Sequence, residues 1–88
     1  MLIATWNVNS ILVRMPNVIR WLDAVKPDVL CMQETKCTDD QFPALALQAA
    51  GYCAAYHGEK SYNGVAILTK IELRAELAIF ARTSKGTK

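Results

Sequence analysis

The sequence predicts a small α/β domain built on a mixed sheet. Two apolar, β-rich segments, residues 2–8 and 29–32, flank a helical pattern, and this strand–helix–strand order has the length expected of a βαβ unit. Two further short apolar segments, residues 52–56 and 65–69, are separated by a polar turn. The 88 residues, 52% of them hydrophobic, suffice for one packed domain and leave no room for a second.

The first strand and the helix that follows it have clear local signals. Residues 2–8 are almost continuously apolar, as in strands that are buried on both faces. Pro16 and Asn17 are expected to open the helix, with Asn17 as its N-cap, and Pro27 is expected to end it. The second strand follows at residues 29–32.

The chirality of this unit places two polar side chains at the same edge of the sheet. Such crossovers are almost always right-handed and leave the two strands parallel. Asn7 stands near the carboxyl end of the first strand and Glu34 near that of the second. Open α/β sheets usually hold their ligands at this edge, so the sequence predicts a functional site there.

The second part of the chain is expected to complete the sheet. Asp39 and Asp40 precede a short helix with Pro43 in its first turn, and Gly51 ends that helix. The apolar positions that we expect on one face of this helix are Phe42, Leu45, Ala46 and Ala49.

The strands at residues 52–56 and 65–69 are expected to form an antiparallel hairpin because the turn between them is short. Residues 71–82 alternate as a strand would, although their Glu, Leu, Arg and Ala content also suits a helix, and we predict a strand. The polar, basic residues 83–88 are expected to be disordered.

Charge and cysteine content exclude several classes of protein. The net charge is +2, so any affinity for nucleic acid must come from a local site or from the tail. The three cysteines form no C-x-x-C pair, which argues against a zinc site or a disulfide framework. No apolar run is long enough to span a membrane and the start of the chain lacks a signal-peptide pattern, so we expect a cytoplasmic protein.

Glu34 and Asn7 are the first candidates for chemistry. A carboxylate directly after an apolar strand is costly unless it is solvated or paired with a cation. Mg²⁺ takes one or two protein carboxylates and completes its shell with water and substrate phosphate, so Glu34 with Asn7 beside it could supply part of such a site. The alternative is an exposed glutamate at a strand end, with Asn7 closing a turn.

The remaining candidates are suited to phosphate. Lys36 shares a face with Glu34 in an extended segment and could neutralise a phosphate; alternatively it is a solvated lysine or part of a surface ion pair. Asn63 and Gly64 could present amide groups to a phosphate, because glycine allows close approach, or could form an ordinary turn. We expect His57 to be a surface residue without a catalytic role.

Taken together and in order, three short motifs carry a resemblance to a known family. The first is Ala4-Thr5-Trp6-Asn7-Val8-Asn9-Ser10, and the second is Pro27-Asp28-Val29-Leu30-Cys31-Met32-Gln33-Glu34-Thr35-Lys36. The third combines Tyr56-His57-Gly58 with Tyr62-Asn63-Gly64-Val65-Ala66-Ile67-Leu68. Up to about residue 70 the chain resembles the start of the exodeoxyribonuclease III and AP endonuclease family, in the endonuclease/exonuclease/phosphatase superfamily. The family fold is a four-layer α/β-β/α sandwich, and the resemblance implies that residues 1–82 supply about half of it.

The resemblance implies a Mg²⁺-dependent DNA repair nuclease, with Mn²⁺ as an alternative ion. Such enzymes cut duplex DNA at abasic sites and trim 3′ ends. Glu34 would be a metal ligand and Asn7 would hold the active-site network, so both count as catalytic and metal-site residues. The residues that would lie along the DNA are Lys36, Tyr62, Asn63, Gly64, Asn9 and Arg14, with Arg14 compensating in part for Leu12, which replaces a usual arginine.

Several motifs of the resembling family have no counterpart in these 88 residues. They supply a tyrosine, an Asp-x-Asn pair, a second metal-side aspartate and a catalytic histidine. We therefore expect the chain to be inactive alone and to need a missing C-terminal half or a second copy. The alternatives are a non-catalytic half-domain that dimerises or binds a partner and, less favoured, a phosphomonoesterase of the same superfamily.

Overall fold

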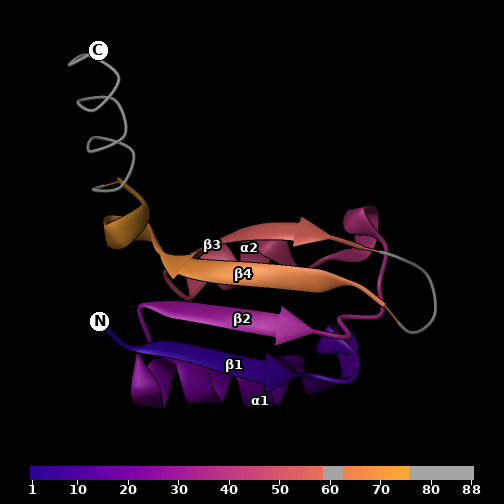
Figure 1. Ribbon diagram of the computed structural model, residues 1–88, viewed down its shortest axis with the longest axis horizontal. Coiled ribbons are helices and arrows are strands. Elements are labelled where there is room, and N and C mark those ends of the chain that lie inside the picture. The colour runs from indigo at the N-terminus through magenta and orange to yellow at the C-terminus, as the bar shows by residue number, and fades with distance from the viewer. Residues whose placement is uncertain (59–62, 76–88) are drawn as a thin grey trace, which may run out of the picture.

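The computed structural model describes residues 1–58 and 63–75 (Figure 1). Within the described residues up to residue 70, four strands and three helices follow one another along the chain. They are β1 (Ile3–Asn7), α1 (Ile11–Val25), β2 (Val29–Gln33), η1 (Asp39–Gln41), α2 (Ala44–Ala49), β3 (Tyr52–His57) and β4 (Val65–Lys70).

The four strands form one mixed sheet in the order β1-β2-β4-β3. β1 and β2 are parallel and are connected by α1, which confirms the predicted βαβ unit. β4 runs antiparallel to both β2 and β3, which confirms the predicted hairpin. The architecture is therefore the mixed α/β class that the sequence predicts.

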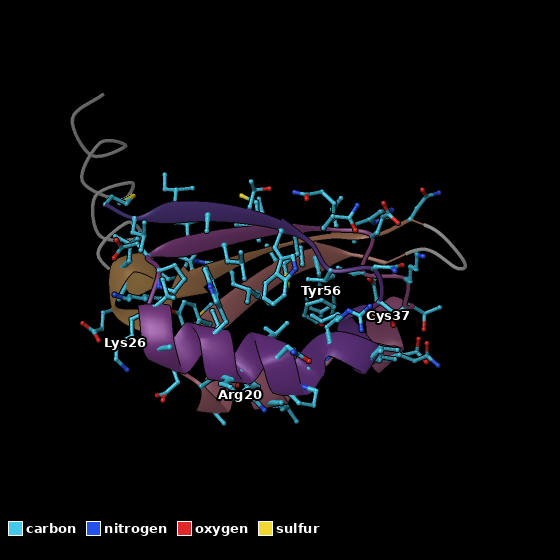
Figure 2. All side chains as sticks on the ribbon, turned by 90° about the horizontal axis from the view of Figure 1, so that it is seen from below. Arg20, Lys26, Cys37 and Tyr56 are labelled. Carbon is cyan, nitrogen blue, oxygen red and sulfur yellow. The ribbon has the colours of Figure 1, made fainter. Side chains whose placement is uncertain are left out.

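One face of the sheet is covered by helices. Figure 2 shows the helices on one side of the strands, where side chains from both layers form the core. Val18 and Leu22 of α1 are buried there together with Leu47 of α2. The strand residues of this core include Leu30, Met32, Tyr52, Ala66 and Leu68.

No described residue covers the opposite face of the sheet. Ile3, Val65 and Ile67 project from this face with 61%, 53% and 47% of their surface exposed. The expectation that the first strand is buried on both faces is wrong for the described structure, because residues 1–58 and 63–75 provide a helical layer on one side alone. The near-continuous apolar pattern of β1 thus leaves exposed apolar surface.

Helix α1 begins earlier than its sequence signals suggest. Its N-cap is Ser10, whose Oγ accepts from the Val13 backbone N–H at 3.4 Å, so the prediction that Asn17 caps the helix is wrong. Pro16 lies inside the helix and lacks the N–H that would bond to the Leu12 carbonyl. The Ser10 cap and the full burial of Ile11 anchor the turn that precedes this proline.

The region before β3 also differs in detail from the prediction. Pro43 precedes α2 rather than lying in its first turn, and Leu45 is 82% exposed while Leu47 is buried. Phe42 lies outside the helix and stacks on Tyr56, with ring centroids 4.0 Å apart. Gly51 follows the helix with a φ of +98°, as predicted for a residue that ends it.

The segment after β4 is helical over residues 71–75, so the strand predicted for residues 71–82 is wrong in its described part. Glu, Leu, Arg and Ala have high helix propensity, and here this local preference outweighs the alternating pattern. Residues 76–82 and the tail 83–88 lie outside the described residues. Among the described helices, none is long and apolar enough to cross a membrane.

Asp28 joins three segments at the amino end of β2. Its Oδ2 accepts from the Leu2 backbone N–H at 2.7 Å, and its Oδ1 lies 3.5 Å from Lys70 Nζ. The hydrogen bond from Leu2 and the charge of Lys70 lower the pKa of Asp28, although burial acts in the other direction. This carboxylate thus fastens β1 and β4 at the edge of the sheet opposite to the predicted site.

Candidate active site

The carboxyl ends of β1 and β2 meet as the parallel pairing requires. Asn7 is the register partner of Gln33, and Glu34 follows directly. The Asn7 Nδ2 donates to Glu34 Oε2 at 2.5 Å. The two residues that the sequence places at one edge of the sheet are therefore in direct contact.

The Asn7 amide is held at both ends. Its Oδ1 accepts from the Asn9 backbone N–H at 3.2 Å, while its nitrogen is directed to Glu34. This arrangement makes Asn7 a donor that orients the carboxylate. The side chain of Glu34 is 42% exposed and can still meet a ligand from solvent.

Lys36 brings a positive charge to the same place. Its Nζ donates to Asn9 Oδ1 at 2.6 Å and lies 3.7 Å from Glu34 Oε1. The two side chains lie near each other although Thr35 separates them, because Glu34 and Lys36 both have left-handed φ angles, of 55° and 54°. The site therefore presents a positive ammonium group beside a negative carboxylate.

Backbone hydrogen bonds hold this segment on both sides. On one side the N–H groups of Ser10 and Ile11 donate to the carbonyls of Glu34 and Thr35 at 2.9 and 3.0 Å. On the other side the N–H groups of Thr35 and Lys36 donate to the carbonyls of Gly64 and Asn63 at 3.2 and 2.9 Å. Non-glycine residues in the left-handed region are uncommon and cluster at functional sites.

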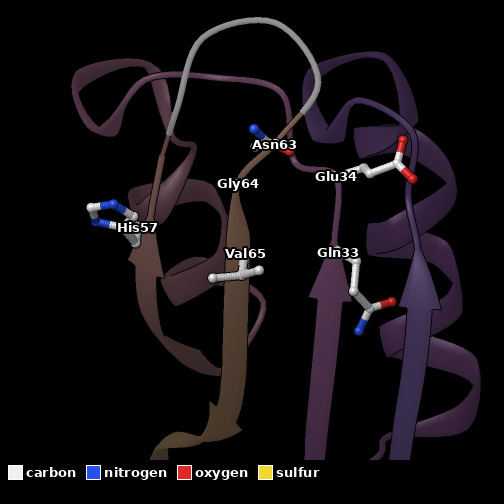
Figure 3. A pocket seen from close by; sticks show the side chains of 6 residues that line it. All are labelled: Gln33, Glu34, His57, Asn63, Gly64 and Val65. Carbon is white, nitrogen blue, oxygen red and sulfur yellow. The ribbon is translucent and has the colours of Figure 1, made fainter.

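A pocket of about 340 Å³ opens beside Glu34 (Figure 3). Its walls come from the ends of β2, β3 and β4 and from the segment that leads into β4. The lining residues are Gln33, Glu34, His57, Asn63, Gly64 and Val65.

His57 and Gln33 line this site, although the sequence analysis quotes both in its motifs without giving either a role in the site. His57 is exposed, as expected of a surface residue, but it pairs in register with Val65, which pairs in turn with Gln33. The three residues thus form a row across the sheet that ends at Asn7. The sequence contains no local signal for this row, since the order of the strands decides it.

The other predicted site residues are distributed unevenly. Asn9, Lys36, Asn63 and Gly64 lie around Glu34, whereas Arg14 belongs to α1 and does not line the pocket. Tyr62 lies outside the described residues.

The donor set of this edge fits part of a magnesium site. Glu34 supplies a carboxylate to the pocket, and no group of three or more His, Cys, Asp or Glu side chains gathers within residues 1–58 and 63–75. Mg²⁺ needs no more than one or two protein carboxylates when water and phosphate complete its octahedron. Glu34 Oε2 accepts from Asn7 and Oε1 lies 3.7 Å from Lys36 Nζ. Each carboxylate oxygen has two lone pairs, so Glu34 retains capacity to bind a cation.

Comparison with known proteins decides the family. The sequence profile described as "Endonuclease/Exonuclease/phosphatase family" matches residues 4–84. The chain belongs to the endonuclease/exonuclease/phosphatase family. The predicted resemblance to exodeoxyribonuclease III and AP endonucleases is also confirmed, as the following relatives show.

Exodeoxyribonuclease III of Haemophilus influenzae is 35% identical over 68 residues, which are 77% of this chain and 26% of that protein. An AP endonuclease from Archaeoglobus fulgidus is 51% identical with a TM-score of 0.75, over 78% of this chain and 27% of that one. A 3′ phosphatase from Neisseria, solved bound to a product DNA hairpin, is likewise 51% identical with a TM-score of 0.76 over the same shares. The chain thus spans about a quarter of the length of each of these three proteins.

Proposed function

We propose that this chain supplies Asn7 and Glu34 to the active site of a Mg²⁺-dependent DNA repair nuclease. The observation that carries the proposal is the contact between Asn7 and Glu34 at the carboxyl edge of the sheet, with Lys36 beside it. A carboxylate that is oriented by an amide and partly open to solvent is suited to hold a divalent cation.

Each side chain has a distinct task in this proposal. When bound, Mg²⁺, or Mn²⁺ in its place, would supply stabilisation of negative charge on the phosphate and on the leaving oxygen. Glu34 binds the ion, and Asn7 fixes the rotamer of Glu34 by donating to one of its oxygens. Lys36 neutralises a DNA phosphate next to the ion, since it is already held 3.7 Å from Glu34.

The pocket is the proposed path of the DNA backbone. Asn63 and Gly64 line the pocket, and Lys36, which is bonded to Asn9, lies 3.7 Å from Glu34, so we propose that amide and ammonium groups contact the phosphates. Tyr62 and Arg14 are proposed as outer DNA contacts. Duplex DNA with abasic sites or 3′ ends is the proposed substrate, because relatives are described as an AP endonuclease and an exodeoxyribonuclease.

The proposed site is incomplete within the described residues. Activation of the attacking water needs a further group, and we assign it to sequence that the chain's relatives have beyond the matched quarter. Residues 1–82 are proposed as the first part of such a domain, and the chain alone is proposed to be inactive.

Two other functions are each favoured by one observation. The uncovered face of the sheet, with Ile3, Val65 and Ile67 exposed, favours a half-domain that binds a second copy or a partner. The 51% identity to a 3′ phosphatase favours removal of a terminal phosphate.

A chimera tests the nuclease proposal. Residues 1–70 replace the matching segment of the Haemophilus exodeoxyribonuclease III, and cleavage of a labelled abasic-site duplex is measured with Mg²⁺ and with EDTA. We expect metal-dependent cleavage that Glu34→Ala abolishes and that Asp23→Asn, a change at an exposed position in α1, leaves intact. Equal cleavage by the parent chimera and by the Glu34→Ala chimera would refute the role of Glu34.

The same preparation separates the alternatives. A 3′-phosphate-terminated duplex reports phosphatase activity, and sedimentation of the isolated chain reports a dimer. Cleavage by the isolated chain itself, lost on Glu34→Ala, would overturn the statement that the chain is inactive alone.

A further inference from the structure

Thr35 and Gly64 approach each other more closely than two ordinary residues could. A Cβ atom on Gly64 would lie 2.2 Å from Thr35 Oγ1, well inside the limit of real contacts. Gly64 also has a φ of +110°, which side chains rarely adopt. The space that glycine leaves at position 64 is therefore filled by the side chain of Thr35.

Thr35 is an unusual residue in its own right. It is fully buried, and its Oγ1 has no hydrogen-bond partner among the described residues. Leaving a buried hydroxyl unpaired costs folding free energy. A side chain kept at this cost acts through its shape, because its polar group forms no bond.

The position of Thr35 explains what that shape could do. Its neighbours Glu34 and Lys36 both have left-handed φ angles, and their side chains are partly exposed, to 42% and 23%. Thr35 points the other way into the interior, against Gly64. A change in how the Thr35 side chain packs would thus rotate the backbone that carries the side chains of Glu34 and Lys36.

We propose that Thr35 is a positioning residue, which packs against Gly64 and thereby holds Glu34 and Lys36 in their working orientation. This inference rests on the proposed function, because it assumes that Glu34 is a metal ligand. In this proposal Gly64 leaves space for the Thr35 side chain, in addition to any contact that it makes with a phosphate. The backbone bonds from Thr35 to Gly64 and from Ile11 to Thr35 keep the segment in place, and the Thr35 side chain sets its rotation.

The chain offers a matched control for Gly64. Gly51 has a φ of +98°, and a Cβ there would meet no atom within 4 Å. Gly51→Ala therefore introduces backbone strain alone, whereas Gly64→Ala introduces comparable strain together with a collision with Thr35. The difference between the two variants isolates the contact.

The test compares four variants of the 88-residue chain, Thr35→Ala, Thr35→Val, Gly64→Ala and Gly51→Ala. Mn²⁺ affinity is measured by titration calorimetry and corrected for the folded fraction. We expect Thr35→Ala and Gly64→Ala to weaken binding about 10-fold to 100-fold, as changes beside metal ligands do. Thr35→Val keeps the branched shape and should keep the affinity, as should Gly51→Ala.

A second readout does not depend on the metal. The NMR signals of the Asn7 side-chain amide report its hydrogen bond to Glu34, with Glu34→Ala as the reference for its loss. We expect Thr35→Ala and Gly64→Ala to shift these signals toward that reference, and Thr35→Val and Gly51→Ala to leave them unchanged.

Each outcome of these measurements supports or overturns the positioning role of Thr35 or the metal role of Glu34. Unchanged Asn7 signals in folded Thr35→Ala, or loss of the wild-type signals in Thr35→Val, would overturn the positioning role. If Glu34→Gln binds Mn²⁺ as well as the wild type does, the proposed function fails at the metal site. The Asn7 signals then still test the positioning role separately. Should Gly64→Ala not fold, Thr35→Ala and Thr35→Val carry the comparison.

Discussion

Asn7→Ala removes both hydrogen bonds of the amide that orients Glu34. The bonds lost are that from Asn7 Nδ2 to Glu34 Oε2 at 2.5 Å and that from the Asn9 N–H to Asn7 Oδ1 at 3.2 Å. A hydrogen bond to a charged group contributes about 1.5–3 kcal/mol and a neutral one about 0.5–1.5 kcal/mol. Both are exposed to solvent, so we take the low ends and expect a loss of about 2 kcal/mol in the free energy of unfolding.

Two assays measure the consequence. Thermal melting of the 88-residue chain should show a Tm lowered by roughly 10 °C, because 1 kcal/mol corresponds to about 4–8 °C in a domain of this size. Titration with Mn²⁺ should show an affinity about 10-fold to 100-fold weaker, since the carboxylate loses the partner that orients it.

Thr5→Val is the matched control for Asn7→Ala. Thr5 lies on the same strand and the same face, and its Oγ1 accepts a neutral hydrogen bond from Gln33 Nε2 at 2.9 Å. We expect this variant to lose no more than about 1 kcal/mol of stability and to bind Mn²⁺ normally. If Asn7→Ala also binds Mn²⁺ normally, the reasoning that Asn7 orients a metal ligand is refuted.

Three further predictions follow from the charges and the core. Lys36→Gln should weaken duplex binding by the chimera and reduce the slope of log K against log salt by about 1, because one phosphate contact is lost; an unchanged slope in fluorescence anisotropy would exclude that contact. Asp28→Asn should destabilise the chain at pH 7. The lowered pKa of Asp28 means that its contribution is present above the unfolded value of 3.8 and is lost as pH falls through the folded value, so urea unfolding of variant and wild type should converge in acid. Leu68→Ala, at a fully buried position, should cost about 2–5 kcal/mol, and Ile67→Ala on the uncovered face much less; equal losses would show that this face is packed in solution.

Local sequence signals were reliable where the signal and the structure depend on the same few residues. The apolar segments correctly predicted these four strands to within one residue at each end. Gly51 ends α2 as predicted, because a left-handed residue after a helix is a local requirement. The Asn17 cap failed because the buried Ile11 and the Ser10 cap extend α1 past a proline that locally signals a helix start.

The site shows the same division. The parallel βαβ unit places Asn7 and Glu34 together, and that inference needs no more than the handedness rule and two strand ends. His57 could not be placed, because its proximity to Gln33 depends on β4 lying between β2 and β3. The exposure of Ile67 could not be predicted from the sequence either, since an apolar residue in a strand does not indicate which face of the sheet is covered.

The sequence by itself determined the mixed α/β class, the family and the pair of residues at the carboxyl edge of the sheet. These follow from short-range patterns and from motifs whose order is written in the chain. The tertiary structure alone decided that Gly64 makes room for Thr35 and that His57 shares the pocket of Glu34. It also decided that, within residues 1–58 and 63–75, one sheet face has no helical layer. The reason is physical, because these features are contacts between residues far apart in sequence, and the energies of such contacts are absent from any local pattern.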